Sequence, residues 1–312
     1  MESLIHMRRI LKLSLTCLAA GAVTACEPDT VIPTEALPFA GVRFINAVPD
    51  TASMDFRFVD LVESNPHWNM QFRGSITTTG GVPASTAIAY KGAREGQRHF
   101  RVFMNGNCNP DGTCDQSFAS TVVIDQTVTL VAGRNYTAIL WGYANPGRTP
   151  APAGLPAGAP AMRLDFVEET VADPGAQVAL RVINATAAAI DVEAYLSSGA
   201  ETGTPQWNDL AALTMGPYIN VAPTNYTNGY LFDVRDGGGA SLIATDARAL
   251  QGDTAQTAAP GPFEAQPGAR VAGSALSAIV WPRSVAGTDA PNVTSTSISF
   301  VWDRRPPRPP GV

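Results

Sequence analysis

A five-residue motif, R-[FV]-I-N-A, occurs twice in the chain and constrains its fold more than any other feature. The first copy lies in "VRFINAVPDTASMDFRF" (42–58), and the second lies in "LRVINATAAAIDVEAYL" (180–196). In both stretches an Asp between two apolar residues follows a few positions later. A similarity that returns after such a long interval indicates tandem domains rather than the short units of a solenoid.

Three further blocks return behind the motif in the same order, each roughly 130 to 140 residues apart. The pairs are "HFRVFMNG" (99–106) with "YLFDVRDGG" (230–238), "YTAILWG" (136–142) with "LSAIVWP" (276–282), and "RLDFVEE" (163–169) with "SISFVWD" (297–303). Chance produces one such pair, but hardly four in register. The sequence therefore predicts two copies of one domain, over residues 40–173 and 176–304.

Apolar and polar residues alternate with a period of two inside these blocks. In "MDFRF" (54–58) the apolar residues fall on one face and the polar residues on the other, which is typical of a half-buried strand. Gly and Asn clusters separate the blocks, and no segment has the period of an amphipathic helix. The predicted fold is all-β, with two tandem antiparallel β-sandwiches of immunoglobulin-like type. The recurrent Trp141 and Trp281 are expected to be core residues.

The Pro-Ala-rich segment 145–162 has the composition of a domain linker, but the repeat contradicts that interpretation. The block at 163–169 follows the segment and still belongs to the first copy. Residues 145–162 are therefore predicted to be a long loop between the last two strands of that copy. The domain boundary is expected in the short stretch 173–175.

Residues 1–25 have the pattern of a secretory signal peptide, with a positive start and an apolar run too short to span a bilayer. The run ends in "VTAC", which resembles the lipobox of bacterial lipoproteins, so Cys26 is the predicted lipidation site. An ordinary signal peptide with a chance cysteine is the alternative. Residues 26–39 then form a tether, and the Pro-rich residues 305–312 form a tail.

The lipoprotein resemblance implies a bacterial cell envelope and contact with the membrane through the N-terminal lipid. Glu27 after the cysteine favours the outer membrane, on either its periplasmic or its surface face. The chain has a net charge of −6, and its basic residues are scattered. Nucleic-acid binding needs a clustered basic face, so no nucleic-acid partner is expected.

Cys108 and Cys114 bracket a turn-forming stretch, "GNCNPDGTCDQ", and are expected to form a disulfide in an oxidising compartment. Metal binding by the two thiolates is the alternative. The same stretch matches the first half of a calcium loop but has Phe118 where a bidentate Glu is required. The candidate calcium ligands are Asn107, Asn109, Asp111 and Asp115. We favour the disulfide-closed turn, and no cofactor is expected.

Signatures of catalysis are absent from the sequence after the signal peptide. The sequence there has two histidines, His67 and His99, and no H-E-x-x-H, G-x-S-x-G or P-loop motif. We expect His67 in a loop and His99 at the start of a strand, each structural or solvated. The chain is therefore not expected to be an enzyme.

The repeated motif, the x-D-[FV] that follows it and the later [TS]-A-I-[LV]-W resemble the domain of unknown function 4397. This resemblance implies a β-rich domain of bacterial secreted and envelope proteins, often present in tandem, and it implies no catalytic residues. The family pattern has a Pro-Asp turn after the first strand. "NAVPD" (46–50) keeps that turn, whereas "NATAA" (184–188) lacks it.

Three classes of function follow from the sequence. The first is a non-catalytic, lipid-anchored envelope protein that binds or scaffolds a polysaccharide, peptidoglycan or a protein, with loops 108–114 and 145–162 as the specific surfaces. The second is an accessory carbohydrate-binding lipoprotein that stacks sugars on Trp68 or Trp207, which lie outside the repeated blocks. The third is an uncharacterised hydrolase that depends on a histidine.

Overall fold

The computed structural model of the chain describes residues 38–61, 67–70, 72–73, 90–104, 121–225, 228–239, 241–254 and 265–306. Every regular element in these ranges is a β-strand, so the all-β prediction is confirmed. None of the described residues belongs to a helix long and apolar enough to cross a membrane. Residues 39–312 form one compact unit.

The first half of this unit contains eight strands. They are β1 (Phe39–Asn46), β2 (Met54–Phe58), β3 (His67–Met70), β4 (Lys91–Arg94), β5 (Gly96–Met104), β6 (Thr121–Leu130), β7 (Asn135–Trp141) and β8 (Arg163–Glu168). The strand order is β4-β1-β7-β8 in one sheet, here called the inner sheet, and β3-β2-β5-β6 in the other, called the outer sheet.

The second half has the same plan. Its strands are β9 (Val178–Asn184), β10 (Ile190–Leu196), β11 (Trp207–Leu210), β12 (Thr214–Met215), β13 (Ile219–Val221), β14 (Tyr230–Asp236), β15 (Leu242–Arg248), β16 (Ala275–Trp281) and β17 (Ser297–Arg304). The inner sheet has the order β12-β9-β16-β17, with β13 also paired to β9, and the outer sheet has the order β11-β10-β14-β15. Strand for strand, the order of one half maps onto the order of the other.

The inner sheets are not purely antiparallel, which corrects the sequence prediction. β1 pairs with β7 in parallel, and β9 pairs with β16 in parallel. The reason is the route of the chain. After β1 the chain crosses to the outer sheet. It then re-enters the inner sheet at the end where β1 begins, so β7 runs in the same direction as β1. Parallel strands always need such a crossover, whereas the outer sheets are built from antiparallel neighbours alone, as predicted.

One apolar cluster joins the inner and outer sheets within each half. In the first half, the rings of Phe44 and Phe100 stack with their centroids 5.5 Å apart. In the second half, Phe232 packs between Trp207 and Phe300. Burial of such aromatic side chains supplies most of the stabilisation in a sandwich-like fold.

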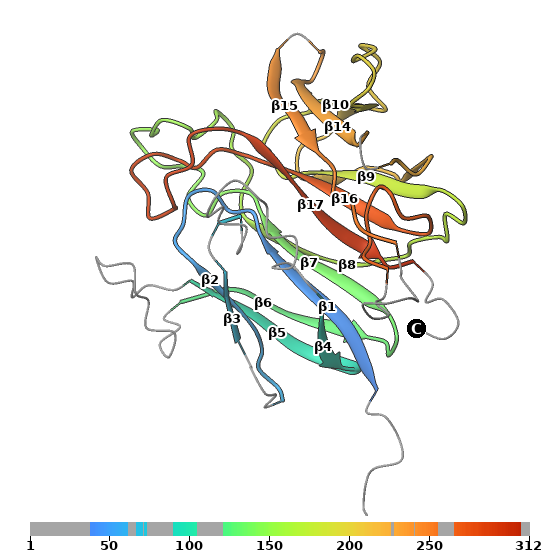
Figure 1. Cartoon of the computed structure of the whole chain (residues 1–312). Coiled ribbons are helices and arrows are strands. Elements are labelled where there is room, and N and C mark those ends of the chain that lie inside the picture. The colour runs from blue at the N-terminus through green and yellow to red at the C-terminus, as the bar shows by residue number, and fades with distance from the viewer. Residues whose placement is uncertain are drawn as a thin grey trace, which may run out of the picture. The chain divides into compact units, whose positions relative to one another are not determined.

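A third apolar cluster joins the two inner sheets across their other faces. It includes Ile45 and Trp141 from the first half and Ile183 and Trp281 from the second. The sheets therefore stack in the order outer, inner, inner, outer (Figure 1). Because the inner sheets are covered on both sides, the motif strands carry apolar residues at nearly every position rather than in alternation.

The segment 145–162 is a loop within the first half, as predicted, because β7 and β8 are antiparallel neighbours on either side of it. Its start is held by Asp50, whose carboxylate accepts the N–H groups of Ala144 and the following residue, each at 2.9 Å. Further along, the carbonyl of Ala153 accepts the N–H of Ala286 at 2.9 Å. The loop is thus tied to both halves.

Candidate functional site

The two arginines of the repeated motif meet between the inner sheets. Arg43 in β1 and Arg181 in β9 alternate with residues of the two sandwich cores, so their side chains project from the opposite face. Arg43 is completely buried, and Arg181 is 5% exposed. A buried charge is costly unless it is paired and hydrogen-bonded, so these positions require carboxylates.

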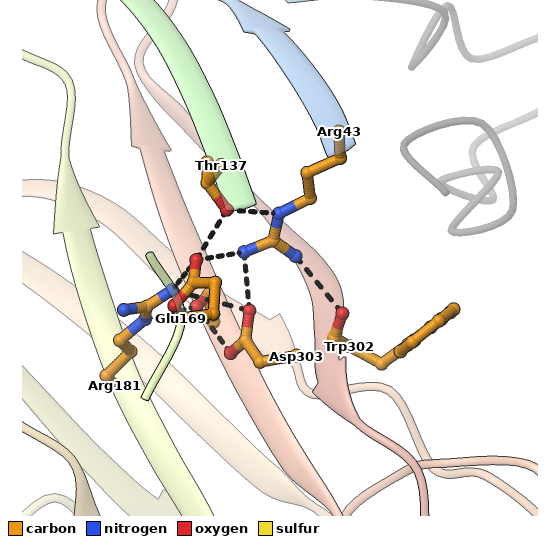
Figure 2. Close-up of polar contacts among 7 residues, drawn as sticks. Arg43, Thr137, Glu169, Arg181, Trp302 and Asp303 are labelled. Atoms are coloured by element: carbon orange, nitrogen blue, oxygen red, sulfur yellow. Dashed lines mark hydrogen bonds and ion pairs between the residues drawn. The ribbon is translucent and has the colours of Figure 1, made fainter. Parts of the chain in front are cut away.

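Two carboxylates at the ends of the last strands supply this pairing. Glu169, directly after β8, accepts hydrogen bonds from Nη2 of Arg43 at 3.0 Å and from Nη2 of Arg181 at 2.7 Å. Asp303, near the end of β17, accepts from the same two atoms at 2.6 Å and 3.4 Å (Figure 2). Each half therefore sends its arginine to the carboxylate of the other half as well as to its own. These four residues are called the buried ion network below.

Thr137 and Tyr90 complete the surroundings of Arg43. Thr137 lies directly opposite Arg43 in the parallel β1–β7 pair. Its Oγ1 accepts a hydrogen bond from Nε of Arg43 at 2.7 Å and donates one to Glu169. The ring of Tyr90 lies 4.9 Å from the guanidinium carbon, within range of a cation–π interaction. Nη1 of Arg43 donates to the carbonyl of Trp302 at 3.1 Å.

The surroundings of Arg181 are equivalent. Ser277 lies opposite Arg181 in the parallel β9–β16 pair. Its Oγ accepts from Nε of Arg181 at 2.6 Å and donates to Asp303 at 2.6 Å. The ring of Tyr218 lies 4.7 Å from the guanidinium carbon. The contact between the halves is therefore approximately two-fold symmetric in its chemistry.

The network keeps both arginines charged. Burial by itself lowers the pKa of Arg43, but the charge of Asp303 and the neighbouring acidic groups outweigh it and raise the pKa above its ordinary value. For Arg181, too, burial lowers the pKa, but the charges of Asp303 and Glu169 outweigh it and raise the pKa above its ordinary value. Burial also raises the pKa values of Tyr90 and Tyr218, which keeps both phenols neutral at physiological pH.

A cleft of about 640 Å³ lies next to the network, lined by residues 133–135, 168–171 and 302–305. Glu169 and Asp303 border this cleft, but their side chains are only 2% and 0% exposed to solvent. At the cleft, Arg134 forms an ion pair with Glu168, and Arg304 forms one with Asp173. The buried ion network is suited to holding the two halves together.

A second hollow, of about 390 Å³, lies at the outer sheet of the second half and is lined by Asp191, Glu193 and Asp233. Their carboxylates accept hydrogen bonds from backbone N–H groups close to the hollow. Asp191 accepts the N–H of Asp209 at 2.6 Å, and Glu193 accepts the N–H of Gly203 at 2.9 Å. Asp233 accepts a backbone N–H from β15 in the same way. These acids thus hold β11, β15 and the loop at residue 203 around the hollow.

Comparison with known families gives a match to half of the chain. Residues 40–195 match the family described as a domain of unknown function, DUF4397. The chain belongs to the DUF4397 family. A search among curated proteins found no match.

The DUF4397 match begins in β1 and ends in β10, so it contains both copies of the repeated motif. Three members of the buried ion network, Arg43, Glu169 and Arg181, lie inside the matched segment. Asp303 lies beyond it, in the last strand of the second half. The network thus ties the family segment to the C-terminal part of the chain.

Trp207, predicted as a sugar-stacking residue, is a core residue of this DUF4397 protein. It is 2% exposed, its ring stacks on Phe232 at a centroid distance of 6.0 Å, and its Nε1 donates to the carbonyl of Pro217 at 3.0 Å. Stacking on a sugar requires an exposed ring face, so the structure corrects this prediction. Trp68 pairs with Phe56 in the backbone register of β3, and its side chain lies outside the described residues.

The histidines are placed differently from the prediction. His67 begins β3 instead of lying in a loop, and its side chain is also outside the described residues. His99 lies within β5, which begins at Gly96. Its side chain is 39% exposed and contacts Asp125, which also binds Arg101 at 2.9 Å.

The other predicted site residues lie outside the described part of the chain. They are the lipidation candidate Cys26, the disulfide candidates Cys108 and Cys114, and the calcium candidates Asn107, Asn109, Asp111 and Asp115. Sequence reasoning did not identify the buried ion network. A signal was available, because Arg recurs in the motif and Glu169 aligns with Asp303 at the ends of "RLDFVEE" and "SISFVWD".

Proposed function

We propose that this DUF4397 protein is a non-catalytic, lipid-anchored protein of the bacterial cell envelope that acts as a rigid binding or scaffolding module. In this proposal the signal peptide is removed, Cys26 carries the lipid, and the protein resides at the outer membrane. The folded part consists of two tandem immunoglobulin-like copies. Partners are an envelope polysaccharide, peptidoglycan or a protein, recognised by the loops.

The buried ion network is the observation that carries the proposal. It uses equivalent residues of the two halves and shares Glu169 and Asp303 between Arg43 and Arg181. Breaking such a network leaves unpaired buried charge, so it penalises any other orientation of the halves. A fixed orientation holds the loops of both halves at constant separation. Preorganisation of this kind lowers the entropic cost of binding, which suits a scaffold.

The surroundings of His99 also favour a non-catalytic role. His99 contacts Asp125, but both lie on the outer sheet with side chains 39% and 46% exposed. A histidine acting in catalysis is normally held in a cleft beside a nucleophile or a substrate pocket. The cleft between the halves and the hollow at the second outer sheet are formed by other residues.

Binding of residues 27–312, purified without lipid, to peptidoglycan sacculi and to envelope polysaccharide tests the proposal by co-sedimentation. We expect saturable binding to one of them that is unchanged by His99→Ala and weakened by Arg43→Met, because the second change loosens the halves. Arg101→Met is the matched control, since it removes an exposed arginine of the outer sheet. A hydrolase screen runs beside it, and turnover that His99→Ala abolishes would overturn the proposal.

Lipid attachment is tested separately in cells. An alkyne-labelled fatty acid is expected to label the wild-type chain and to leave Cys26→Ser unlabelled, with the wild type recovered in the outer-membrane fraction. Wild-type protein that is released in soluble form without label would contradict the anchoring.

A further inference from the structure

Two exposed apolar residues lie in adjoining segments where the first half begins. Phe39, the first residue of β1, is 44% exposed, and Val131, in the turn between β6 and β7, is 42% exposed. The N–H of Gly133 in that turn donates to the carbonyl of Phe39 at 2.9 Å, which holds the turn against the start of β1.

Val59 and Leu61 lie at the same end of the first half. They follow β2 and are 39% and 40% exposed. The N–H of Val59 donates to the carbonyl of His99, close to the start of β5, at 2.9 Å. The start of β5 pairs with the end of β6, directly before the turn that contains Val131. Phe39, Val59, Leu61 and Val131 are called the apolar end below.

The apolar end contains half of the eight large apolar side chains that are at least 37% exposed among the described residues. Single exposed apolar residues are ordinary, but a group of them at one place marks an interaction surface. The other four are on strands: Leu196 ends β10, while Val122, Leu242 and Ile243 begin the edge strands β6 and β15.

The position of β1 connects the apolar end with the proposed anchor. Phe39 follows Cys26 by 13 residues in the sequence. A fully extended chain of that length spans at most about 45 Å. A lipid on Cys26 therefore keeps this end of the fold near the bilayer and leaves the far ends of β1 and β7 further from it.

Charge at the apolar end is compatible with a lipid surface. β4 places Arg94 directly opposite Phe39, and Lys91 lies further along the same exposed strand. Cationic side chains next to apolar ones favour anionic headgroups. Two acidic residues lie at this end: Asp60 is paired with Arg98 at 2.9 Å, and the exposed Glu95, next to Arg94, accepts the backbone N–H of Ala132 at 3.2 Å.

We propose that the apolar end rests on the bilayer, with Phe39, Val59, Leu61 and Val131 inserted at the boundary between headgroups and acyl chains. This inference rests on the proposed function, because the lipid on Cys26 is what brings this end to the membrane. It adds an orientation: the axis of the strands stands away from the membrane, and the loop 145–162 faces away from it.

A polarity-sensitive fluorophore reports the orientation. The full lipidated chain is reconstituted in vesicles of phosphatidylethanolamine and phosphatidylglycerol, with the nitrobenzoxadiazole label attached through Val131→Cys under non-reducing conditions. Leu242→Cys is the matched control, since Leu242 is 46% exposed at the start of β15. We expect the label at position 131 to shift to shorter wavelength and to be quenched several-fold more by doxyl-phospholipids than the label at position 242. Equal responses of the two labels, or none, would overturn the inference.

Flotation of the vesicles separates failure of this inference from failure of the proposed function. A wild-type chain that does not float with vesicles removes the anchoring and the inference together. A chain that floats, while the label at position 131 remains in water, leaves the anchoring intact and removes only the orientation. The chain without an added cysteine gives the background, and near-ultraviolet circular dichroism confirms that both labelled variants are folded.

Discussion

The two halves use equivalent residues where they touch each other and different residues at their outer surfaces. At the contact, Arg43 and Arg181 share the carboxylates of Glu169 and Asp303, and each also bonds a hydroxyl group of the neighbouring parallel strand. In the loops after the motif strands, the first half uses Asp50 to hold the loop 145–162, whereas the second half has Thr186, which bonds within its own turn. Buried charge tolerates little change, so divergence is concentrated in the loops, where binding specificity usually resides.

The outer sheets differ in the same sense. Asp55 and Asp191 follow the motif in the two halves, yet Asp55 pairs with Arg57 at 2.7 Å while Asp191 accepts the backbone N–H of Asp209. Carboxylates of the first outer sheet pair with arginines, within β2 and between β5 and β6, whereas those of the second accept backbone N–H groups of β11, of β15 and of the loop at residue 203. A shared fold therefore carries two different outer surfaces, which is consistent with a module whose halves contact different parts of a partner.

Removal of one member of the buried ion network has the largest expected effect. Arg43→Met leaves the buried Asp303 with one cation, Arg181 at 3.4 Å, beside the hydroxyl of Ser277, and we expect a loss of about 3–5 kcal/mol in the free energy of unfolding. Arg181→Met is expected to cost less, because Arg181 is slightly exposed and reaches Asp303 only at 3.4 Å. Urea denaturation followed by tryptophan fluorescence measures both.

Two further variants sharpen this test. The double variant Arg43→Met with Asp303→Leu removes one positive and one negative charge and leaves Arg181 paired with Glu169, so it is expected to be more stable than Arg43→Met alone. Arg101→Met, at an exposed pair, is expected to change stability by less than about 1 kcal/mol. Equal losses in Arg43→Met and Arg101→Met would contradict the structural role of the network.

The two equivalent tryptophans provide a second comparison. Nε1 of Trp281 donates to the hydroxyl of Ser299 at 2.7 Å in a buried site, whereas Nε1 of Trp141 donates to the partly exposed Asp165 at 3.1 Å. Trp281→Phe leaves a buried hydroxyl without its donor, and we expect a loss of about 1–3 kcal/mol. Trp141→Phe is expected to cost less, because water can replace the lost bond. Thermal unfolding compares the two, and a larger loss in Trp141→Phe would contradict this account.

The loop contacts of Asp50 give a smaller effect, of about 1 kcal/mol or less for each partly exposed hydrogen bond. Asp50→Ala removes the two backbone bonds at the start of the loop 145–162. We expect faster cleavage of this loop in limited proteolysis, with little change in global stability. Thr186→Ala, at the corresponding turn of the second half, is the control and should leave cleavage of the loop unchanged. Identical cleavage in both variants would show that Asp50 does not hold the loop.

The smallest effect concerns an exposed contact between the connecting segment and the last strand. Hydrogen bonds from Arg304 lower the pKa of Asp173 to about 2. A carboxyl whose pKa is lowered by folding contributes stability above its unfolded pKa, and that contribution is lost as the pH falls towards about 2. Carbon-13 chemical shifts of Asp173 followed by NMR should give this low pKa, and Arg304→Gln should return it to the ordinary range. An unchanged pKa in that variant would rule out the pairing.

Much of the fold could be predicted from local patterns. The alternation in "MDFRF" (54–58) corresponds to β2, the recurrence of Trp141 and Trp281 predicted two core residues, and the repeat assigned 145–162 to a loop. The burial of Trp207 could not be predicted in this way. It lies outside the repeated blocks, and tertiary packing covers its ring, which stacks on Phe232 of β14 and lies against Gly216 and Pro217.

The candidate site was not predictable to the same degree. The sequence by itself determined the strand character of the motif, its duplication and the presence of an Arg in each copy. Only the tertiary structure decided that β1 and β7 run in parallel, that the inner sheets face each other and that Arg43 reaches Asp303 at 2.6 Å. The physical reason is the separation in sequence over which each signal acts. Periodicity records which side of a strand is buried, whereas a buried charge is neutralised by a residue that the fold brings from 260 positions away.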